Sequence, residues 1–441
     1  MDVVKAAIVL FTRDLRVHDN PALAAAAQEA ARIVPLFVFD AAILGSGFAR
    51  PNRVTFLLDA LRDLDASLAA RGGRLVVRAG DVVVETLALA REVGAEAVFL
   101  AEDASGYAQR RRQRLGEACS SHRIALRTTP GVTVAPLSSI TTSSGTHYSV
   151  FTPFFRAWSG ARQRPLVPAP HRLSMPTGVA TGSVPEPRRL VAGSPSPVLP
   201  CGGETAGRER LAAWLRSGVA AYGARHDELA ASGTSHLSPY LHFGCLSPLE
   251  VARRAGEIGG AEPFLRQLAW RDFFHQLLAA RPETVREDMR PRGRRWSGDR
   301  EALEAWKNGE TGYPIVDAGM RQLLREGYMH NRARLVTASF LVHHLRIDWR
   351  AGARHFFDWL VDGDVANNVG NWQWVAGTGA NPRPNRVLNP LRQAHRFDPD
   401  GAYVRRYVRE LAAIDGPAVH EPWRLREDVA GYPGPIVETV A

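Results

Sequence analysis

The first 130 residues alternate short apolar runs with segments whose apolar residues recur at helical spacing, and this alternation constrains the fold most. Apolar runs separated by helices predict parallel strands joined by helical crossovers, in a doubly wound α/β sheet. Pro21, directly after Asp19-Asn20, is typical of a helix start. The five predicted strands are 6–11, 33–39, 74–77, 97–100 and 124–126, and the predicted helices are 21–31, 54–70, 82–93 and 107–120.

The pattern changes twice after residue 130. Residues 165–200 are rich in proline and poor in periodic apolar positions, which is typical of a connector. Beyond residue 204 helical spacing dominates and strand signals almost vanish. We therefore expect an α/β domain at 1–130, an interdomain connector at 131–203 and an all-α domain at 204–441. Helices in the last part are predicted at 208–221, 248–257, 262–280, 319–326, 333–345 and 349–360.

Composition points to a polyanionic partner. The chain has 441 residues and a formal charge of +10, and its pI is about 10, although a codon bias toward arginine and alanine explains the same excess. Its three cysteines are far apart in sequence, as expected in a reducing cytoplasm, and no long apolar run predicts a signal peptide or a membrane span. We expect a soluble cytoplasmic protein.

Several chemistries lack their motifs. The sequence has no G-x-x-x-x-G-K-[ST], no C-x-x-C, no H-E-x-x-H and no G-x-S-x-G, which argues against a P-loop nucleotidase, the common zinc sites and a serine hydrolase. No G-x-G-x-x-G follows the first strand, so a dinucleotide site of the dehydrogenase type is not expected. His343-His344 lies in an apolar run and is expected to pack rather than to bind a metal.

The segment 362–374 carries the densest polar and aromatic cluster. Two carboxylates, Asp362 and Asp364, three asparagines and two tryptophans lie within it. Carboxylates and amides satisfy the polar edge of a ring cofactor, and indoles offer flat apolar faces. The alternative is an acidic turn followed by a helix whose indoles fill the core.

Three further clusters suit the same kind of ligand. Gly233–Ser238 places hydroxyls and free N–H groups at a predicted helix start, which favours either an anion site or an ordinary helix cap. Gln267, Trp270 and Arg271 share one helix face, which suits a flat heterocycle beside a phosphate or plain core packing. The third cluster lies at the start of the helix 333–345, where arginines oppose the helix dipole and predict a nearby anion; its members are Asn331, Arg332 and Arg334.

Together these segments resemble the photolyase/cryptochrome family over nearly the whole chain. The resemblance is closest to bacterial class I cyclobutane pyrimidine dimer photolyases. It is carried by 12–21, 233–238, Trp270-Arg-Asp-Phe, 311–334, 349–374 and His420-Glu-Pro-Trp423.

The resemblance implies three sets of residues. FAD would be held by Tyr222, Thr234, Ser235, His236, Leu237, Ser238, Phe264, Arg271, Asn331, Arg334, Asp362, Gly363 and Asp364, with Asn368 facing flavin N5. Electrons would reach the flavin through Trp372, Trp349 and Trp296. UV-damaged DNA and its flipped lesion would meet His226, Gln267, Trp270, Arg271, Asn331, Arg332, Leu335 and Trp374.

Four positions depart from the family pattern. Gln267 stands where dimer photolyases carry glutamate, and it resembles (6-4) photolyases there; a glutamine donates a hydrogen bond but supplies no proton. Leu335 replaces a methionine, His226 an arginine and Phe264 a tryptophan. The (6-4) enzymes match poorly elsewhere, because they carry paired histidines where this chain has His330-Asn331.

The predicted activity is light-driven repair of pyrimidine dimers by electron transfer from reduced FAD. A signalling cryptochrome is the alternative, although the chain stops soon after Trp423, without the long tail that many of those carry. A flavin electron-transfer protein without a DNA role is a third possibility, which leaves the positive charge unexplained. Arg53 and Asp103 resemble an antenna site for 8-hydroxydeazaflavin more than one for methenyltetrahydrofolate. We further expect a monomer without a metal.

Overall fold

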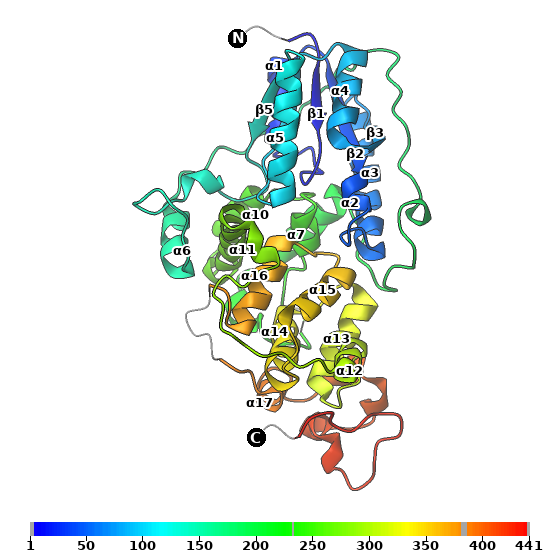
Figure 1. Ribbon diagram of the computed structural model, residues 1–441, viewed down its shortest axis with the longest axis vertical. Helices are drawn as coiled ribbons and strands as arrows, with labels where there is room; N and C mark the ends of the chain where they lie inside the picture. The colour runs from blue at the N-terminus through cyan, green and yellow to red at the C-terminus, as the bar shows by residue number, and fades with distance from the viewer. Residues whose placement is uncertain (1–3, 232, 381–385, 439–441) are drawn as a thin grey trace. The chain divides into compact units, whose positions relative to one another are not determined.

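A five-stranded parallel sheet forms the N-terminal part of the protein (Figure 1). The computed structural model describes residues 4–231, 233–380 and 386–438. The strand order is β3-β2-β1-β4-β5, and every strand pair is parallel. The strands are β1 (Ala7–Leu10), β2 (Ile33–Asp40), β3 (Val76–Gly80), β4 (Ala97–Ala101) and β5 (Ala125–Thr129).

The central strands are apolar because both faces of the sheet are covered. Ala7 of β1 lies beside Ile33 of β2 and Ala97 of β4, and every residue of these three strands is buried. The outer strands β3 and β5 contain exposed residues. Continuous apolar runs in the centre are typical of parallel sheets.

Helices connect the strands in the order predicted. Helix α1 packs against β1, β4 and β5, whereas α4 packs against β1, β2 and β3. The order along the sheet reverses after β3. Right-handed crossovers therefore place the helices that precede β2 and β3 on one face and the helices that precede β4 and β5 on the other. The doubly wound architecture is therefore confirmed. These helices are α1 (Pro21–Glu29), α2 (Ala41–Leu44), α3 (Pro51–Ala69), α4 (Val82–Val93) and α5 (Gly106–Ser121).

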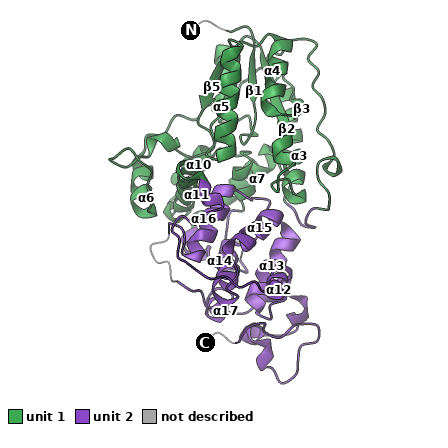
Figure 2. Ribbon diagram, in the orientation of Figure 1, with its two compact units in different colours: residues 1–194, 200–220, 236–282 green, residues 195–199, 221–235, 283–441 purple. Residues whose placement is uncertain are grey.

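The chain divides into two compact units (Figure 2). Unit 1 comprises residues 1–194, 200–220 and 236–282, and unit 2 comprises 195–199, 221–235 and 283–441. Unit 1 thus takes in helices from beyond the predicted domain boundary at residue 203. These are α7 (Glu204–Ser217), α9 (Ser238–His242), α10 (Pro248–Gly256) and α11 (Glu262–Ala280).

The loop after β1 ties these helices to the sheet. The carboxylate of Glu204 accepts hydrogen bonds from the backbone N–H groups of Val17 and His18, at 2.7 and 3.1 Å. Buried Arg16 donates to the carbonyl of Gly244 at 2.9 Å. Gly244 has a φ of 69°, and a Cβ there would overlap the backbone of the β1 loop. Only glycine fits this close approach.

Unit 2 has no strand within its described residues and is built from helices around one apolar core. The core includes Trp306, Trp349, Phe356 and Trp372. The predicted helix 333–345 ends at Ser339 and continues as a π-helical turn, Phe340–His344. The helices are α8 (Tyr222–Arg225), α12 (Arg300–Asn308), α13 (Pro314–Glu326), α14 (Asn331–Ser339), α15 (Trp349–Trp359), α16 (Val365–Ala376), α17 (Pro390–Phe397) and α18 (Ala402–Tyr407).

One helix lies where the sequence predicted only a connector. Helix α6 (Phe151–Gly160) carries an aromatic face formed by Phe151, Phe154, Phe155 and Trp158. Their spacing of three, four and seven residues is helical, so the signal was present in the sequence. Helix α6 packs against α11, which accounts for its aromatic side.

Candidate active site

An ion pair links the start of α14 to the acidic segment before α16. Nη2 of Arg334 donates to both carboxylate oxygens of Asp362, at 3.1 and 2.9 Å, and its Nε donates to the carbonyl of Met329 at 2.8 Å. The Asp362 side chain is only 3% exposed. The anion predicted opposite Arg334 is thus, in part, a carboxylate of the same chain.

Asp364 and Asn368 are held by the start of α16. Asp364 is the N-cap residue, and its Oδ1 accepts from the backbone N–H of Asn367 at 2.9 Å. The side-chain amide of Asn368 donates to the carbonyl of Ala353 at 3.0 Å, which fixes the plane of that amide. Gly363 separates the two aspartates, and the backbone N–H of Asp364 donates to the carbonyl of Asp362 across it. Together with Arg334, the segment holds two carboxylates, one oriented amide and a guanidinium close in sequence or paired with one another.

Three buried indoles gather behind this segment. Trp372 lies on α16 and meets Trp306 at a ring distance of 6.1 Å and Phe356 at 5.0 Å, both edge-on. Trp349 begins α15 and is 1% exposed. The helices α15 and α16 pack together, and a Cβ on Gly352 would overlap the Trp372 ring. Glycine at this position therefore makes room for the indole.

Trp349 and Trp296 each lie beside a charged side chain. The indole N–H of Trp349 donates to Oδ1 of Asp288 at 2.9 Å, and the same carboxylate pairs with Arg350 at 3.0 Å. Trp296 is half-buried against the core of unit 2, and the guanidinium of Arg294 lies 6.0 Å from its ring centre. Trp349 and Trp372 are thus enclosed, whereas Trp296 reaches solvent.

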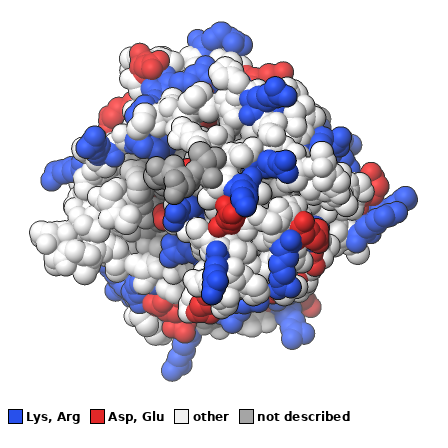
Figure 3. Space-filling model, turned by 90° about the horizontal axis from the view of Figure 1, so that it is seen from above, with Lys and Arg blue, Asp and Glu red and all other residues white. Residues whose placement is uncertain are grey.

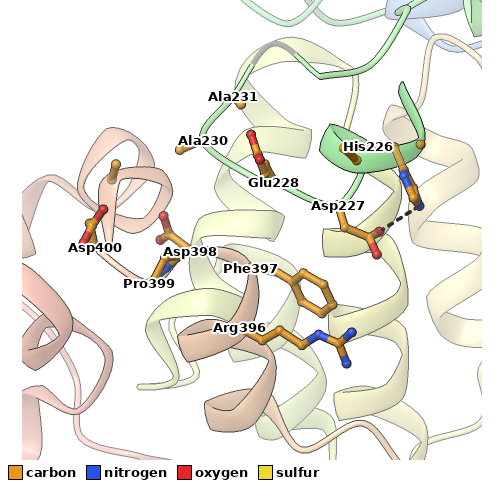
Figure 4. Close-up of a pocket in the computed structure, with 13 residues that line it drawn as sticks. His226, Asp227, Glu228, Ala230, Ala231, Arg396, Phe397, Asp398, Pro399 and Asp400 are labelled. Carbon is orange, nitrogen blue, oxygen red and sulfur yellow. Dashed lines mark ion pairs between the residues drawn. The ribbon is translucent and has the colours of Figure 1, made fainter. Parts of the chain in front are cut away.

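Two residues predicted at the DNA surface meet around Asp227. The Arg332 guanidinium donates to both oxygens of Asp227, at 3.1 and 2.6 Å, and lies 4.3 Å from the ring centre of Phe397. His226 lies 3.7 Å from the same carboxylate, an ion pair drawn as a dashed line in Figure 4. Asp227 and Phe397 line a pocket of about 550 Å³, together with His226 and Arg396.

The remaining predicted ligands of unit 2 lie on different elements. Tyr222 begins α8, its ring lies 5.0 Å from that of His226, and burial raises the pKa of its phenol. Thr234 and Ser235 are half-buried in the segment after α8, and Asn331 is exposed at the start of α14. Leu335 and Trp374 are partly buried against the core of unit 2.

In unit 1, the predicted FAD residues lie in the turn before α9, at the start of α9 and on α11. His236 has a φ of 53°, a left-handed conformation that marks a tight turn before α9. Leu237 is buried and Ser238 opens α9. Phe264 is 4% exposed and packs against Trp214 at a ring distance of 5.6 Å. Phe264 is thus a core residue of unit 1.

The predicted face of α11 is formed, but its members differ in their contacts. Gln267 is exposed and Trp270 is half-buried. Trp270 stacks on Phe151 of α6 with a ring distance of 3.7 Å and an angle of 4°. Arg271 donates to the backbone carbonyls of Val132 and Leu241, at 2.6 and 3.2 Å, and lies beside Asp272. Part of its donor capacity therefore holds unit 1 together.

Of the two proposed antenna residues, Asp103 lies just after the carboxyl end of β4 and Arg53 lies in the first turn of α3. Arg13, after β1, pairs with Asp103, after β4, at 3.3 Å, at the point where the strand order reverses. Asp103 also lines a cavity of about 250 Å³ with Arg112 and His275. Arg53 is 2% exposed and donates to the carbonyl of Phe48 at 2.9 and 2.6 Å.

Sequence reasoning missed several partners. Trp306, Asp288, Asp227 and Phe397 were not predicted, although each contacts a predicted residue. Trp306 could have been found from its place among the tryptophans of the helical part. The two aspartates and Phe397 carry no local signal, because they are distant in sequence from their partners.

Neither the face shown in Figure 3 nor the described histidine, cysteine, aspartate and glutamate side chains mark a further site. On the face shown in Figure 3, basic and acidic side chains are interspersed rather than separated. Among the described residues, no group of three or more histidine, cysteine, aspartate or glutamate side chains is arranged to hold a metal ion. No helix in this part of the chain is long and apolar enough to cross a membrane.

Comparison with known proteins finds two matching family profiles. The profile of the FAD binding domain of DNA photolyase matches residues 264–441, and that of DNA photolyase matches residues 7–171. A deoxyribodipyrimidine photo-lyase of Streptomyces griseus is 52% identical over 99% of this chain and 97% of its own length.

Two solved structures show the same fold. A bacterial class III photolyase from Agrobacterium tumefaciens is 33% identical, with a TM-score of 0.92 over 99% of this chain and 95% of its own. An archaeal photolyase from Sulfolobus tokodaii with two FAD molecules is 32% identical, with a TM-score of 0.87 over 98% and 96% of the two chains. The chain belongs to the DNA photolyase family.

Proposed function

We propose that this protein uses light to split cyclobutane pyrimidine dimers in DNA, with reduced FAD as the electron donor. The observation that carries the proposal is the 52% identity to a deoxyribodipyrimidine photo-lyase over nearly the whole chain. A repair enzyme of this kind is a carbon–carbon lyase. The assignment to class I within the family stays a prediction.

The donor set in unit 2 fits the polar parts of FAD. Arg334 offers N–H groups beside Asp362, while Thr234 and Ser235 offer hydroxyl and backbone donors that suit a pyrophosphate. Asn368, oriented by the carbonyl of Ala353, presents an amide to the flavin edge. Bound reduced FAD supplies, on excitation, the electron that breaks the dimer. In unit 1, considered by itself, the residues proposed to contact FAD are His236, Leu237, Ser238, Phe264 and Arg271.

Trp372, Trp349 and Trp296 are proposed to return electrons to an oxidised cofactor. Trp372 and Trp349 are buried, and the exclusion of water around them suits an electron relay. Trp296 is half-buried, so an external reductant in solvent can reach it. Trp306 lies edge-on to Trp372 and orients the Trp372 indole. The supporting feature is the close packing of α15 on α16 around Gly352.

DNA recognition is proposed for residues of both units, considered separately. In unit 1, Gln267 and Trp270 present an amide and an indole to a flipped dimer. In unit 2, Leu335 and Trp374 provide apolar contacts, and Asn331, Arg332 and His226 contact the strand. Moving a base out of the duplex costs a few kcal/mol, and less for a damaged pair that stacks poorly. Photolyases are a known example of enzymes that flip their target out of the duplex.

An antenna chromophore is proposed at the carboxyl ends of the strands. Asp103 lies just after β4, Arg53 lies in the first turn of α3, and the Sulfolobus tokodaii relative carries two FAD molecules. We propose 8-hydroxydeazaflavin rather than methenyltetrahydrofolate as its occupant. Mass spectrometry of the chromophores released from the purified protein decides between them. We also propose that the protein acts as a monomer in the cytoplasm.

The test of the repair activity is direct. Reduced, FAD-loaded protein is mixed with an oligonucleotide that contains one thymine dimer and is illuminated with near-UV or blue light. We expect recovery of the two thymines in the light and none in the dark. Normal flavin photochemistry without any recovered thymine would instead support a photoreceptor.

A further inference from the structure

Arg266, on α11, lies against two aromatic rings of α6. Its guanidinium carbon is 5.1 Å from the ring centre of Phe151 and 4.7 Å from that of Phe155. The residue is half-buried, and it forms no hydrogen bond or ion pair with the residues that the structure describes. Its charge is therefore held in place by ring faces alone, while its N–H edge keeps its donors.

The aromatic rings that support Arg266 are themselves packed against further rings of unit 1. Phe151 is 5% exposed and lies flat against Trp270, and its ring also stacks with Phe155 at 5.8 Å and 19°. Phe155 continues the stack to Trp158 at 6.1 Å. The indole N–H of Trp158 donates to the buried carboxylate of Asp272 at 2.9 Å. The position of Arg266 is thus determined by packing that reaches into the core of unit 1.

The neighbouring arginine of the same helix differs. Arg271 donates to the carbonyls of Val132 and Leu241 and lies 3.6 Å from Asp272. Arg266 has no such partner, although it precedes Gln267 directly and stands one turn before Trp270. Residues four apart share a helix face, so Arg266 lies on the face assigned to the lesion.

We propose that Arg266, supported by Phe151 and Phe155, binds a backbone phosphate of the DNA strand that carries the dimer. This inference rests on the proposed DNA-repair function. A guanidinium presents parallel N–H donors that match two phosphate oxygens. Because one of its faces is already occupied by the rings, its free edge suits a phosphate better than a stacked base. The contact would hold the strand beside Gln267 and Trp270 without reading its sequence.

The test is DNA binding in the dark, measured by fluorescence anisotropy at several salt concentrations with dimer-containing and undamaged oligonucleotides. We expect Arg266→Ala to weaken binding to both oligonucleotides by the same factor, roughly tenfold at low salt, and to reduce the slope of log K against log salt by about 0.9. Arg266→Lys keeps the charge and loses the planar fork, so it should keep the salt slope and bind with intermediate affinity.

Two further variants separate the contact from general charge and from folding. Arg91→Ala removes an equal charge from α4, on an exposed position, and should change neither affinity by more than about twofold, since no specific phosphate contact is lost. Phe155→Leu removes ring support and should weaken binding while leaving the slope unchanged. Flavin content and thermal unfolding verify that each variant is folded.

The outcomes are distinct. Unchanged affinity and slope in Arg266→Ala would show that Arg266 only covers the aromatic rings, and loss of dimer binding alone would show that it reads the lesion; either result overturns the proposal. Should Arg266→Ala fail to fold, the Lys and Leu variants decide by the same measurements. Wild-type protein that binds DNA but repairs no dimer would refute the repair function and leave this binding result interpretable.

Discussion

The indole N–H of Trp349 donates a 2.9 Å hydrogen bond to the carboxylate of Asp288, so a buried tryptophan has an anion as its partner. A negative charge at this distance stabilises positive charge on the ring, because a partly buried pair interacts more strongly than a pair in water. Arg350 shares the carboxylate and offsets part of this effect.

We expect Asp288→Asn to slow photoreduction of the oxidised flavin about tenfold, which corresponds to roughly 1.4 kcal/mol of lost stabilisation of the oxidised ring. The amide oxygen still accepts the hydrogen bond, so folding should be almost unaffected. The measurement is the loss of oxidised-flavin absorbance under blue light with an external reductant. Trp349→Phe serves as the reference for a broken relay, and an Asp288→Asn rate equal to that of wild type would contradict the electrostatic argument.

The ion pair between Arg334 and Asp362 gives a second prediction. Asp362→Asn leaves a half-buried guanidinium without its charged partner, and breaking a buried pair in this way costs roughly 3 kcal/mol. We expect a lower free energy of unfolding and loss of flavin during purification. Denaturant titration and the ratio of flavin to protein absorbance measure the two effects.

A surface pair provides the matched control. Asp65→Asn breaks an ion pair with Arg74, which is 56% exposed, and should lower the free energy of unfolding much less than Asp362→Asn, because solvent screens the charges. Equal losses in the two variants would show that burial of the Asp362 carboxylate is energetically unimportant.

The sheet and the start of α14 could be predicted because their signals are local. Five apolar runs and the helical spacing between them give the doubly wound order, and the cluster of Asn331, Arg332 and Arg334 marks a helix start. The partners of these arginines could not be predicted. Asp227 and Asp362 lie 105 and 28 positions away from Arg332 and Arg334, and no periodicity connects residues so far apart.

The assignment of Arg271 shows the same limit. Its place on one helix face with Trp270 followed from spacing, but spacing does not indicate that its donors reach backbone carbonyls 139 and 30 positions away. The contacts of Arg266 were missed for a related reason. Helix α6 lies within the predicted connector, so its aromatic rings were not available as partners in the sequence argument.

His355 should make stability depend on pH. Burial, together with nearby Lys307, lowers the pKa of His355 to about 4. The unfolded chain takes up this proton near pH 6.5, so the contribution of neutral His355 is complete above that pH and is lost as the pH falls toward 4, by up to roughly 3 kcal/mol. Asp317 acts in the opposite direction, because burial raises its pKa to about 6.

The two effects are separated by a variant. His355→Gln removes the histidine titration and leaves Asp317 in place. Between pH 7 and pH 4, the difference in unfolding free energy between wild type and variant should fall by most of the roughly 3 kcal/mol expected for His355. Guanidinium titration at each pH measures this difference. A constant difference would mean that His355 titrates alike in the folded and unfolded chains.

Gln267 should limit the yield of repair rather than the binding of DNA. It is exposed on α11 and forms no hydrogen bond to the described part of the chain, so an isosteric change leaves the fold intact. An amide donates a fixed hydrogen bond to a carbonyl that gains negative charge, whereas a protonated carboxyl also supplies a proton. We expect Gln267→Glu to raise the number of dimers split per absorbed photon, with dark affinity for the dimer within about twofold of wild type, since no backbone phosphate contact changes. Gln267→Ala, which has no donor, should lower that yield at least about tenfold. A Gln267→Glu yield at or below that of wild type would mean that proton supply at this position does not limit repair.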